Sequence, residues 1–226
     1  MSSKEFPIGK TLTKNDYVIV CGDFGAIWDG GKSDAYLQKW YASKPWTTLF
    51  VDGNHENHSI INSYPVEEWH GGKVHKINDS IIHLMRGQVY EIDGKTFFTF
   101  GGARSVDKCY RKEGISWWPE EMPSSEEYSE GAANLNKVNW KVDYIITHDS
   151  DMEDIENMGH WYSIDGNDLN RYIWNLKHTF YLEYKKHFFG HYHINMEIND
   201  KDYCLYTKII NIENGKNYHK FYGTER

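Results

Sequence analysis

The sequence predicts one mixed α/β domain over residues 1–226, with two separate β regions. Three observations lead to this prediction. Near the N-terminus an apolar run, a helical pattern and a second apolar run follow one another, which is the order of a β-α-β unit. In the middle of the chain three short apolar runs are separated by turn residues, which is typical of antiparallel strands. No linker, internal repeat or low-complexity tract divides the chain.

The N-terminal third has the pattern of a parallel strand pair. Tyr17–Cys21 is a short apolar run that predicts a buried strand, and the glycine-rich stretch Gly22–Gly31 predicts a loop. Ser33–Tyr41 has helical spacing, with its first residue as the expected N-cap. Thr48–Val51 predicts the next strand, which we expect to lie parallel to the first because a helix separates them. A short helix is expected near Ser59–Ser63.

The middle of the chain predicts antiparallel strands followed by a long loop. Short apolar runs at Ile81–Leu84, Val89–Ile92 and Thr96–Phe100 predict three strands. Asp93-Gly94 stands between the last two runs and predicts a tight hairpin turn. Lys108–Asn134 is polar, aromatic and irregular, which favours a functional loop or a lid over regular structure.

The C-terminal third returns to alternating strands and helices. Tyr144–Thr147 predicts a buried strand, and apolar residues recur with helical spacing across Asp165–Lys186. Further strands are predicted at His187–Phe189, Tyr203–Thr207 and Ile209–Ile212.

The amino-acid composition excludes several classes of protein. Hydrophobic residues make up 39% of the chain, which is typical of an ordered globular protein. The net charge of −8 argues against a broad basic surface for nucleic acid. No signal peptide or apolar run long enough to span a membrane is found, so we expect a cytoplasmic protein with no membrane partner. The three cysteines, Cys21, Cys109 and Cys204, lack disulfide-framework spacing and suit a reducing compartment.

Four of the apolar runs end directly in polar residues that suit metal binding. Strand ends in α/β folds converge on one edge, where ligands bind, so we expect these residues to lie close together. Carboxylate, amide and imidazole groups are the ligands of hydrolytic metal centres. The candidate residues are Asp23, Asn54, His55, His148, His191 and His193.

These residues resemble the motifs of the calcineurin-like metallophosphoesterases. That family carries the blocks D-x-H, G-D, G-N-H-[ED], a later His, and G-H-x-H in this order. The chain matches four of them, at Gly22-Asp23, Gly53-Asn54-His55-Glu56, Thr147-His148 and Gly190-His191-Tyr192-His193. The resemblance spans most of the chain and implies a two-sheet αββα sandwich flanked by helices.

The resemblance also implies a role for each metal-ligand candidate. Asp23 would bridge two divalent cations, since each carboxylate oxygen can bind one. Asn54, His148 and His191 would complete the protein ligands of the second cation. His193 would belong to the first cation. Mn²⁺, Fe²⁺/Fe³⁺ or Zn²⁺ would suit these mixed nitrogen and oxygen ligands.

The catalytic role implied by the resemblance falls on His55. It would donate a proton to the leaving-group oxygen, a common task of histidine near neutral pH. Water activated at two cations about 3.5–4 Å apart would attack phosphorus in line. The expected activity is therefore that of a metal-dependent phosphoric ester hydrolase.

The chain departs from the family pattern at its first block. No Asp in the chain has a His two residues later, so the two D-x-H ligands of the first cation are missing. One metal site is therefore complete and the other incomplete, and the first strand of the family fold is expected to be absent. Two explanations stay open: Met1 is a truncated or misassigned start, or the chain is a natural variant with one good metal site.

A second departure concerns the substrate. Phosphoprotein phosphatases of the family follow G-D with an Asp-Arg pair, whereas Phe24-Gly25-Ala26-Ile27 follows here. This favours a phosphodiesterase, nuclease or nucleotide hydrolase, acting on a phosphorylated small molecule, a nucleotide or a nucleic-acid end. The alternative is a non-catalytic binding protein that keeps the fold, which the missing block favours and His55 disfavours. The oligomeric state is not predicted.

Several other polar residues have both a functional and an ordinary interpretation. Asp23 and Asn54 also suit turns, and His148 also suits a polar loop. Three arginines could clamp phosphate, although surface or packing roles are commoner. Trp117-Trp118 could stack on a base or pack in the core. The acidic run Glu120–Glu127 favours a solvated loop. The three arginines are Arg86, Arg104 and Arg111.

Overall fold

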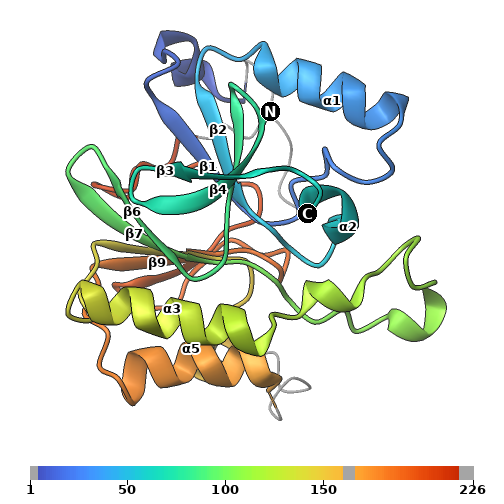
Figure 1. Ribbon diagram of the computed structural model, residues 1–226. Coiled ribbons are helices and arrows are strands. Elements are labelled where there is room, and N and C mark those ends of the chain that lie inside the picture. Colours follow the sequence, from blue (N-terminus) through green and yellow to red (C-terminus); the bar gives the residue numbers. More distant parts are fainter. Residues whose placement is uncertain (1–4, 160–165, 219–226) are drawn as a thin grey trace.

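Two mixed β-sheets pack face to face in the computed structural model, which describes residues 5–159 and 166–218 (Figure 1). One sheet has five strands and the other has six, and the described part of the chain also contains five α-helices. The predicted α/β class with two β regions is therefore confirmed.

The five-stranded sheet has the order β1-β2-β5-β4-β3. Its strands are β1 (Tyr17–Cys21), β2 (Thr47–Val51), β3 (Val66–Trp69), β4 (Gly72–Asn78) and β5 (Ile81–Leu84). The first two are parallel and in register from one end to the other, as the β-α-β pattern predicted. Strand β1 lies at the edge of this sheet. Because β1 and β2 are parallel, their carboxyl ends open on the same side.

The six-stranded sheet has the order β10-β11-β9-β8-β7-β6. Its strands are β6 (Gln88–Ile92), β7 (Lys95–Phe100), β8 (Tyr144–Thr147), β9 (Lys186–Phe189), β10 (Met196–Glu197) and β11 (Asp202–Cys204). The first two form the predicted hairpin, in which Asp93 and Gly94 both have positive φ. Strands β7, β8, β9 and β11 are parallel, so polar residues that follow β8 and β9 emerge at one edge.

Helices cover the outer face of each sheet. The bounds are α1 (Lys32–Ala42), α2 (His58–Ile61), α3 (Ser125–Lys137), α4 (Met152–Asn157) and α5 (Asp168–His178). Apolar residues of α1 and α2 pack on the five-stranded sheet, and those of α3 and α5 pack on the six-stranded sheet. Figure 1 shows the resulting layers, with α3 and α5 side by side below the sheets and α1 above them.

The inter-sheet core is built from apolar side chains of both sheets. Leu49 and Val51 of β2 meet Tyr90, Ile146 and Phe188 of the other sheet, and all five are almost completely buried. Burial of one such side chain stabilises the fold by about 1.5–3 kcal/mol. This core therefore fixes the two sheets relative to each other, and with them the polar loops at their strand ends.

The predicted irregular loop Lys108–Asn134 is wrong in its second half, where α3 begins at Ser125. Ser124 and Glu127 form a reciprocal capping box that starts this helix. Leu135 is fully buried against the six-stranded sheet. The predicted solvated acidic run is also wrong at Glu121, which is fully buried. The segment is polar in composition because its helix buries only a narrow apolar stripe, and for this reason the helix was not predicted.

The C-terminal half of the chain departs from prediction in further places. Helix α5 ends at His178, because the chain turns at Tyr181, which has a positive φ of 53°. The predicted start of that helix, Asp165, lies outside the described residues. The predicted strand Ile209–Ile212 is not one, since only an isolated bridge joins Ile210 to Asn217. Near the N-terminus, Gly31 rather than Ser33 is the N-cap of α1.

No helix in residues 5–159 and 166–218 has the length and apolar character that crossing a lipid bilayer requires.

We expect Leu135→Ala to lower the free energy of unfolding by about 2–5 kcal/mol, because it opens a cavity under α3. Asn136→Ala, on the exposed side of the same helix, is the matched control and should change it by less than about 0.5 kcal/mol. Urea titration followed by circular dichroism measures both. Equal, small effects would mean that α3 is not packed on the sheet.

Candidate metal centre

Three of the predicted ligands meet where the two sheets come together. Asp23 follows β1, Asn54 follows β2 and His148 follows β8. The Nε2 atom of His148 lies 3.3 Å from Oδ1 of Asp23 and 3.2 Å from Oδ1 of Asn54. The strand-end pattern thus brings a carboxylate, an amide and an imidazole from three separate loops to one point.

His148 connects the two sheets. It is 1% exposed, and its Nδ1 atom lies 2.7 Å from the carbonyl oxygen of Cys21 at the end of β1. Burial alone would lower the pKa of His148, but the contacts with the Asp23 carboxylate and the Cys21 carbonyl and the nearby Glu56 together outweigh burial and raise the pKa to about 9. The ring therefore sits where positive charge is strongly attracted, as a cation site requires.

Glycine is needed at three positions for these loops to approach. A Cβ atom on Gly53 would lie 2.2 Å from Oδ1 of Asp23, and one on Gly22 would lie 2.1 Å from Nδ1 of His148. A Cβ atom on Gly190 would lie 2.6 Å from the carbonyl oxygen of Cys21. The glycines that precede the predicted ligands are thus the residues that let the loops converge.

Three predicted site residues adopt a backbone conformation that side-chain-bearing residues seldom use. The φ angles are 50° for Asp23, 65° for His191 and 54° for His193. Such residues are uncommon and gather at functional sites, where the surrounding structure holds them. The positive φ angles therefore agree with a functional role for the loops after β1 and β9.

His191 lies beside His148, and His193 follows two residues later in the chain. The rings of His148 and His191 meet edge to face, with centroids 5.1 Å apart. Burial lowers the pKa of His191, which favours the neutral imidazole that binds metals. His193 is exposed, and its ring stacks on Tyr206 at 4.9 Å. Participation of His193 in a metal site stays a prediction.

A buried hydrogen-bond chain orients Asn54. Its Nδ2 atom donates to Oγ of Ser105 at 3.0 Å, so that Oδ1 faces His148. Ser105 in turn donates to Glu121 at 2.6 Å, and Lys108 pairs with Glu121 at 2.6 Å. Outer partners of this kind fix the direction of a metal ligand.

Glu56 holds the loops after β1 and β2 together. Its carboxylate is fully buried and accepts hydrogen bonds from the backbone N–H groups of Phe24, Gly25 and Gly53. Burial and the nearby Asp23 carboxylate raise the pKa of Glu56 to about 7. The fourth residue of the G-N-H-E segment is therefore a structural clamp.

His55 lies against Arg111 from the long loop after β7. The backbone N–H of His55 donates to Oδ1 of Asp23 at 3.0 Å, which places the residue next to the predicted ligands Asp23 and His148. The Nη1 and Nη2 atoms of Arg111 lie 3.1 and 3.3 Å from the two ring nitrogens of His55. Burial lowers the pKa of His55, and the Arg111 charge contributes in the same direction.

A groove of about 970 Å³ runs along β1 to the predicted ligands. Within the described residues β1 pairs only with β2, so its other edge faces this groove. The lining includes apolar side chains of both sheets, and Asp23, His148 and His191 lie along it. Within residues 5–159 and 166–218, the candidate site is thus open to a ligand.

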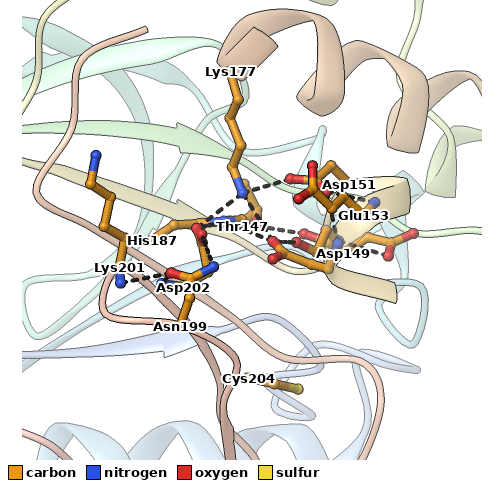
Figure 2. Close-up of polar contacts among 12 residues, drawn as sticks. Thr147, Asp149, Asp151, Glu153, Lys177, His187, Asn199, Lys201, Asp202 and Cys204 are labelled. Carbon is orange, nitrogen blue, oxygen red and sulfur yellow. Dashed lines mark hydrogen bonds and ion pairs between the residues drawn. The ribbon is translucent and has the colours of Figure 1, made fainter. Parts of the chain in front are cut away.

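Asp154, His187 and Asp202 form a second, buried group that could hold a metal ion, with ligand atoms within 4.8 Å of one another. Lys177 already points into it, as Figure 2 shows. Its Nζ atom lies 2.9 Å from Asp154, 3.0 Å from Asp202 and 2.6 Å from Asp151. Because the ammonium group contacts the carboxylate oxygens that a metal would use, Lys177 is the cation of this cluster.

The Lys177 cluster, made of Lys177 with Asp151, Asp154 and Asp202, supports the loop that carries His148. One ammonium faces three carboxylates, so burial and the neighbouring carboxylates raise the pKa of Asp154 to about 7. Thr147, directly before His148, lies 2.8 Å from Nε2 of His187 at the rim of the cluster. The cluster thereby anchors the end of β8.

Comparison of the chain with models of known protein families finds no match, and comparison with curated proteins finds none either. The site is therefore assigned from its own geometry.

Sequence reasoning missed two residues that shape the site and undervalued a third. Ser105 and Glu121 orient Asn54, and no motif pointed to them. Arg111 was considered a phosphate ligand but ranked below a packing role, although it lies on His55. All three belong to the segment after β7. The lack of regular apolar spacing in this segment was the one sequence feature that indicated a functional loop.

The Lys177 cluster predicts a pH-dependent stability. The folded-state pKa of Asp154, about 7, lies above its unfolded value of 3.8, so between these values the folded state binds more protons than the unfolded state. Stability is therefore lost as pH rises from 3.8 to about 7. Asp154→Asn removes this loss. The variant should match the wild type near pH 4 and exceed it by roughly 1–3 kcal/mol above pH 7.

Unfolding by urea at pH 4 and pH 8 measures the difference. The exposed Asp200→Asn is the control and should follow the wild type at both values. If Asp154→Asn is destabilising at pH 8, then the ionised Asp154 carboxylate stabilises the fold and our description of the cluster is wrong.

Proposed function

We propose that this chain is a metal-dependent phosphoesterase of the calcineurin-like type, which hydrolyses a P–O bond in a phosphodiester or nucleotide. The observation that carries the proposal is the meeting of Asp23, Asn54 and His148 at one point, with His55 beside them. These residues come from loops far apart in the sequence, and each follows a strand.

The fold supports the proposal. Two packed sheets with helices on both outer faces agree with the αββα sandwich that the motif resemblance implies. The family's first strand, which ends in D-x-H, would pair with the free edge of β1. Among the described residues no strand occupies that edge, and the groove along it runs to Asp23. We propose that the described chain is this sandwich without its first strand.

The residues present fit one divalent cation better than two. Asp23, Asn54, His148 and His191 offer mixed oxygen and nitrogen donors, which suit Mn²⁺, Fe or Zn²⁺. A second cation would share Asp23 and take His193, and has no further protein ligand from the four matched blocks. A bound cation would supply activation of water and stabilisation of negative charge on the phosphoryl oxygens.

The chain's own groups would handle protons and orientation. His55 lies at the edge of the ligand cluster, where it would give a proton to the departing oxygen. Ser105 and Glu121 hold the Asn54 amide in one direction, and Glu56 holds the loops on which Asp23 and His55 lie. Such preorganisation reduces the rearrangement that the transition state requires.

The alternative is a non-catalytic binding protein that keeps the fold and one cation. The missing D-x-H ligands favour it. The two proposals differ over His55: a binding protein needs metal ligands, whereas only an enzyme needs a proton donor beside them.

We expect His55→Ala to lower turnover of a phosphodiester with a poor leaving group by about 10²–10⁴-fold while leaving bound metal unchanged. A metal ligand should behave differently, so His191→Ala should lower bound metal and turnover together. His178→Ala, on the outer helix α5, is the control and should change neither. Elemental analysis and steady-state kinetics on the same preparations give both quantities.

Two outcomes would contradict the role of His55. Loss of the cation in His55→Ala would make the residue a ligand. If neither metal content nor turnover changed, His55 would be structural, and the binding-protein alternative would gain.

We also expect the chain as it stands to hydrolyse bis-p-nitrophenyl phosphate weakly, because one cation cannot stabilise both the attacking and the leaving oxygen. Fusing an extended apolar segment that ends in Asp-x-His ahead of Met1 should raise turnover by roughly a hundredfold or more. Bound metal should rise from one ion to two. The control segment carries Ala-x-Ala. Full activity and two cations without any addition would show that other residues replace the missing ligands.

A further inference from the structure

We propose that Arg111 binds the negatively charged leaving group of the substrate, so that the enzyme acts on phosphoanhydrides such as nucleoside diphosphates in preference to simple diesters. This inference rests on the proposed function, because it takes His55 as the proton donor to the departing oxygen. It adds a substrate class and a residue that neither the motif blocks nor their spacing assigned.

Arg111 is held in place from its own loop. Its Nε atom pairs with Asp107 at 2.8 Å, and its Nη1 atom donates to the carbonyl oxygen of Ser116 at 3.0 Å. The side chain is 16% exposed. These two contacts and those of Nη1 and Nη2 with His55 fix the guanidinium, so the group is positioned before any ligand binds.

The outer end of Arg111 has more hydrogen-bond donors than His55 can use. A guanidinium carries five N–H groups, of which Asp107 and Ser116 take two. The remaining three are on Nη1 and Nη2, which lie 3.1 and 3.3 Å from the two ring nitrogens of His55. A neutral imidazole accepts at only one ring nitrogen. Two N–H groups of Arg111 therefore remain for an incoming oxygen, in the forked geometry that suits phosphate.

The position beside His55 identifies which part of the substrate Arg111 would meet. In the hydrolysis, the oxygen of water bonds to phosphorus and its proton passes to solvent, while the bond from phosphorus to the leaving oxygen breaks. His55, which takes up a proton from solvent before the step, gives it to that leaving oxygen. A group in contact with the His55 ring therefore lies on the leaving-group side. An arginine there favours a leaving group that carries its own negative charge, as a nucleotide or phosphate does.

The other two arginines considered from the sequence have different surroundings. Arg86 is buried and donates to Asp52 from Nε at 2.9 Å, with a further contact to Glu127, so it forms part of the fold. Arg104 is exposed in the same loop as Arg111. It provides a matched control that removes the same charge from the same segment without touching His55.

The test compares two substrates on the Mn²⁺-loaded protein. Arg111→Ala should lower kcat/KM for adenosine diphosphate roughly ten- to a hundredfold more than for bis-p-nitrophenyl phosphate, whose leaving group has no phosphate. Arg111→Lys, which keeps the charge but not the fork, should recover part of the loss. Arg104→Ala should leave both values unchanged. Equal losses on the two substrates would overturn the assignment to the leaving group.

A binding measurement separates this inference from the proposed function. Isothermal titration with the methylene analogue of adenosine diphosphate should show weaker binding to Arg111→Ala by at least tenfold, and no change in Arg104→Ala. If the wild type hydrolyses neither substrate, the proposed function fails, yet this binding difference still supports Arg111 as an anion ligand. Equal binding by Arg111→Ala and the wild type would overturn the role of Arg111 whatever the activity.

Discussion

The contact of His148 with Asp23 and with the end of β1 joins the two sheets at the candidate site, and the surrounding loops depend on it. His148 belongs to the six-stranded sheet, and its two ring nitrogens reach Cys21 and Asp23 at the end of β1. Such close approach is possible only because Gly22 and Gly53 have no side chain. The convergence of polar loops is therefore a property of the backbone, and the ligand cluster follows from it.

Buried ion pairs and hydrogen bonds support each of these loops. Glu56 clamps the loops after β1 and β2, and the Lys177 cluster anchors the loop after β8. Buried charges of this kind are costly to desolvate and often add little to stability. Here they form hydrogen bonds and ion pairs with backbone and side-chain groups of the loops. Without these contacts the loops would be less firmly held. We interpret them as positioning devices, because a metal ligand is effective only when its direction is fixed.

The sequence was most informative where the spacing of apolar residues and the turn residues beside them indicated the same element. The bounds of β1, β2 and the hairpin at Asp93 were predicted within a residue or two. The proximity of Asp23, Asn54 and His148 was also predicted, because the ends of parallel strands share an edge of a sheet. Helix α3 was missed because it is polar on most of its surface. Lys177 was missed because a lone lysine in a helix usually faces solvent, and its three partners come from elsewhere in the chain. Arg111 was undervalued because nothing local shows that its loop folds back onto His55.

The most direct test of the central claim is the anomalous diffraction of Mn²⁺ in crystals of the protein. The account predicts one strong peak in contact with Asp23, Asn54 and His148, at about 2.0–2.2 Å from the ligand atoms. It also predicts none within the Lys177 cluster, where the ammonium of Lys177 contacts the carboxylates. A peak between Asp154, His187 and Asp202, with none beside Asp23, would contradict the account.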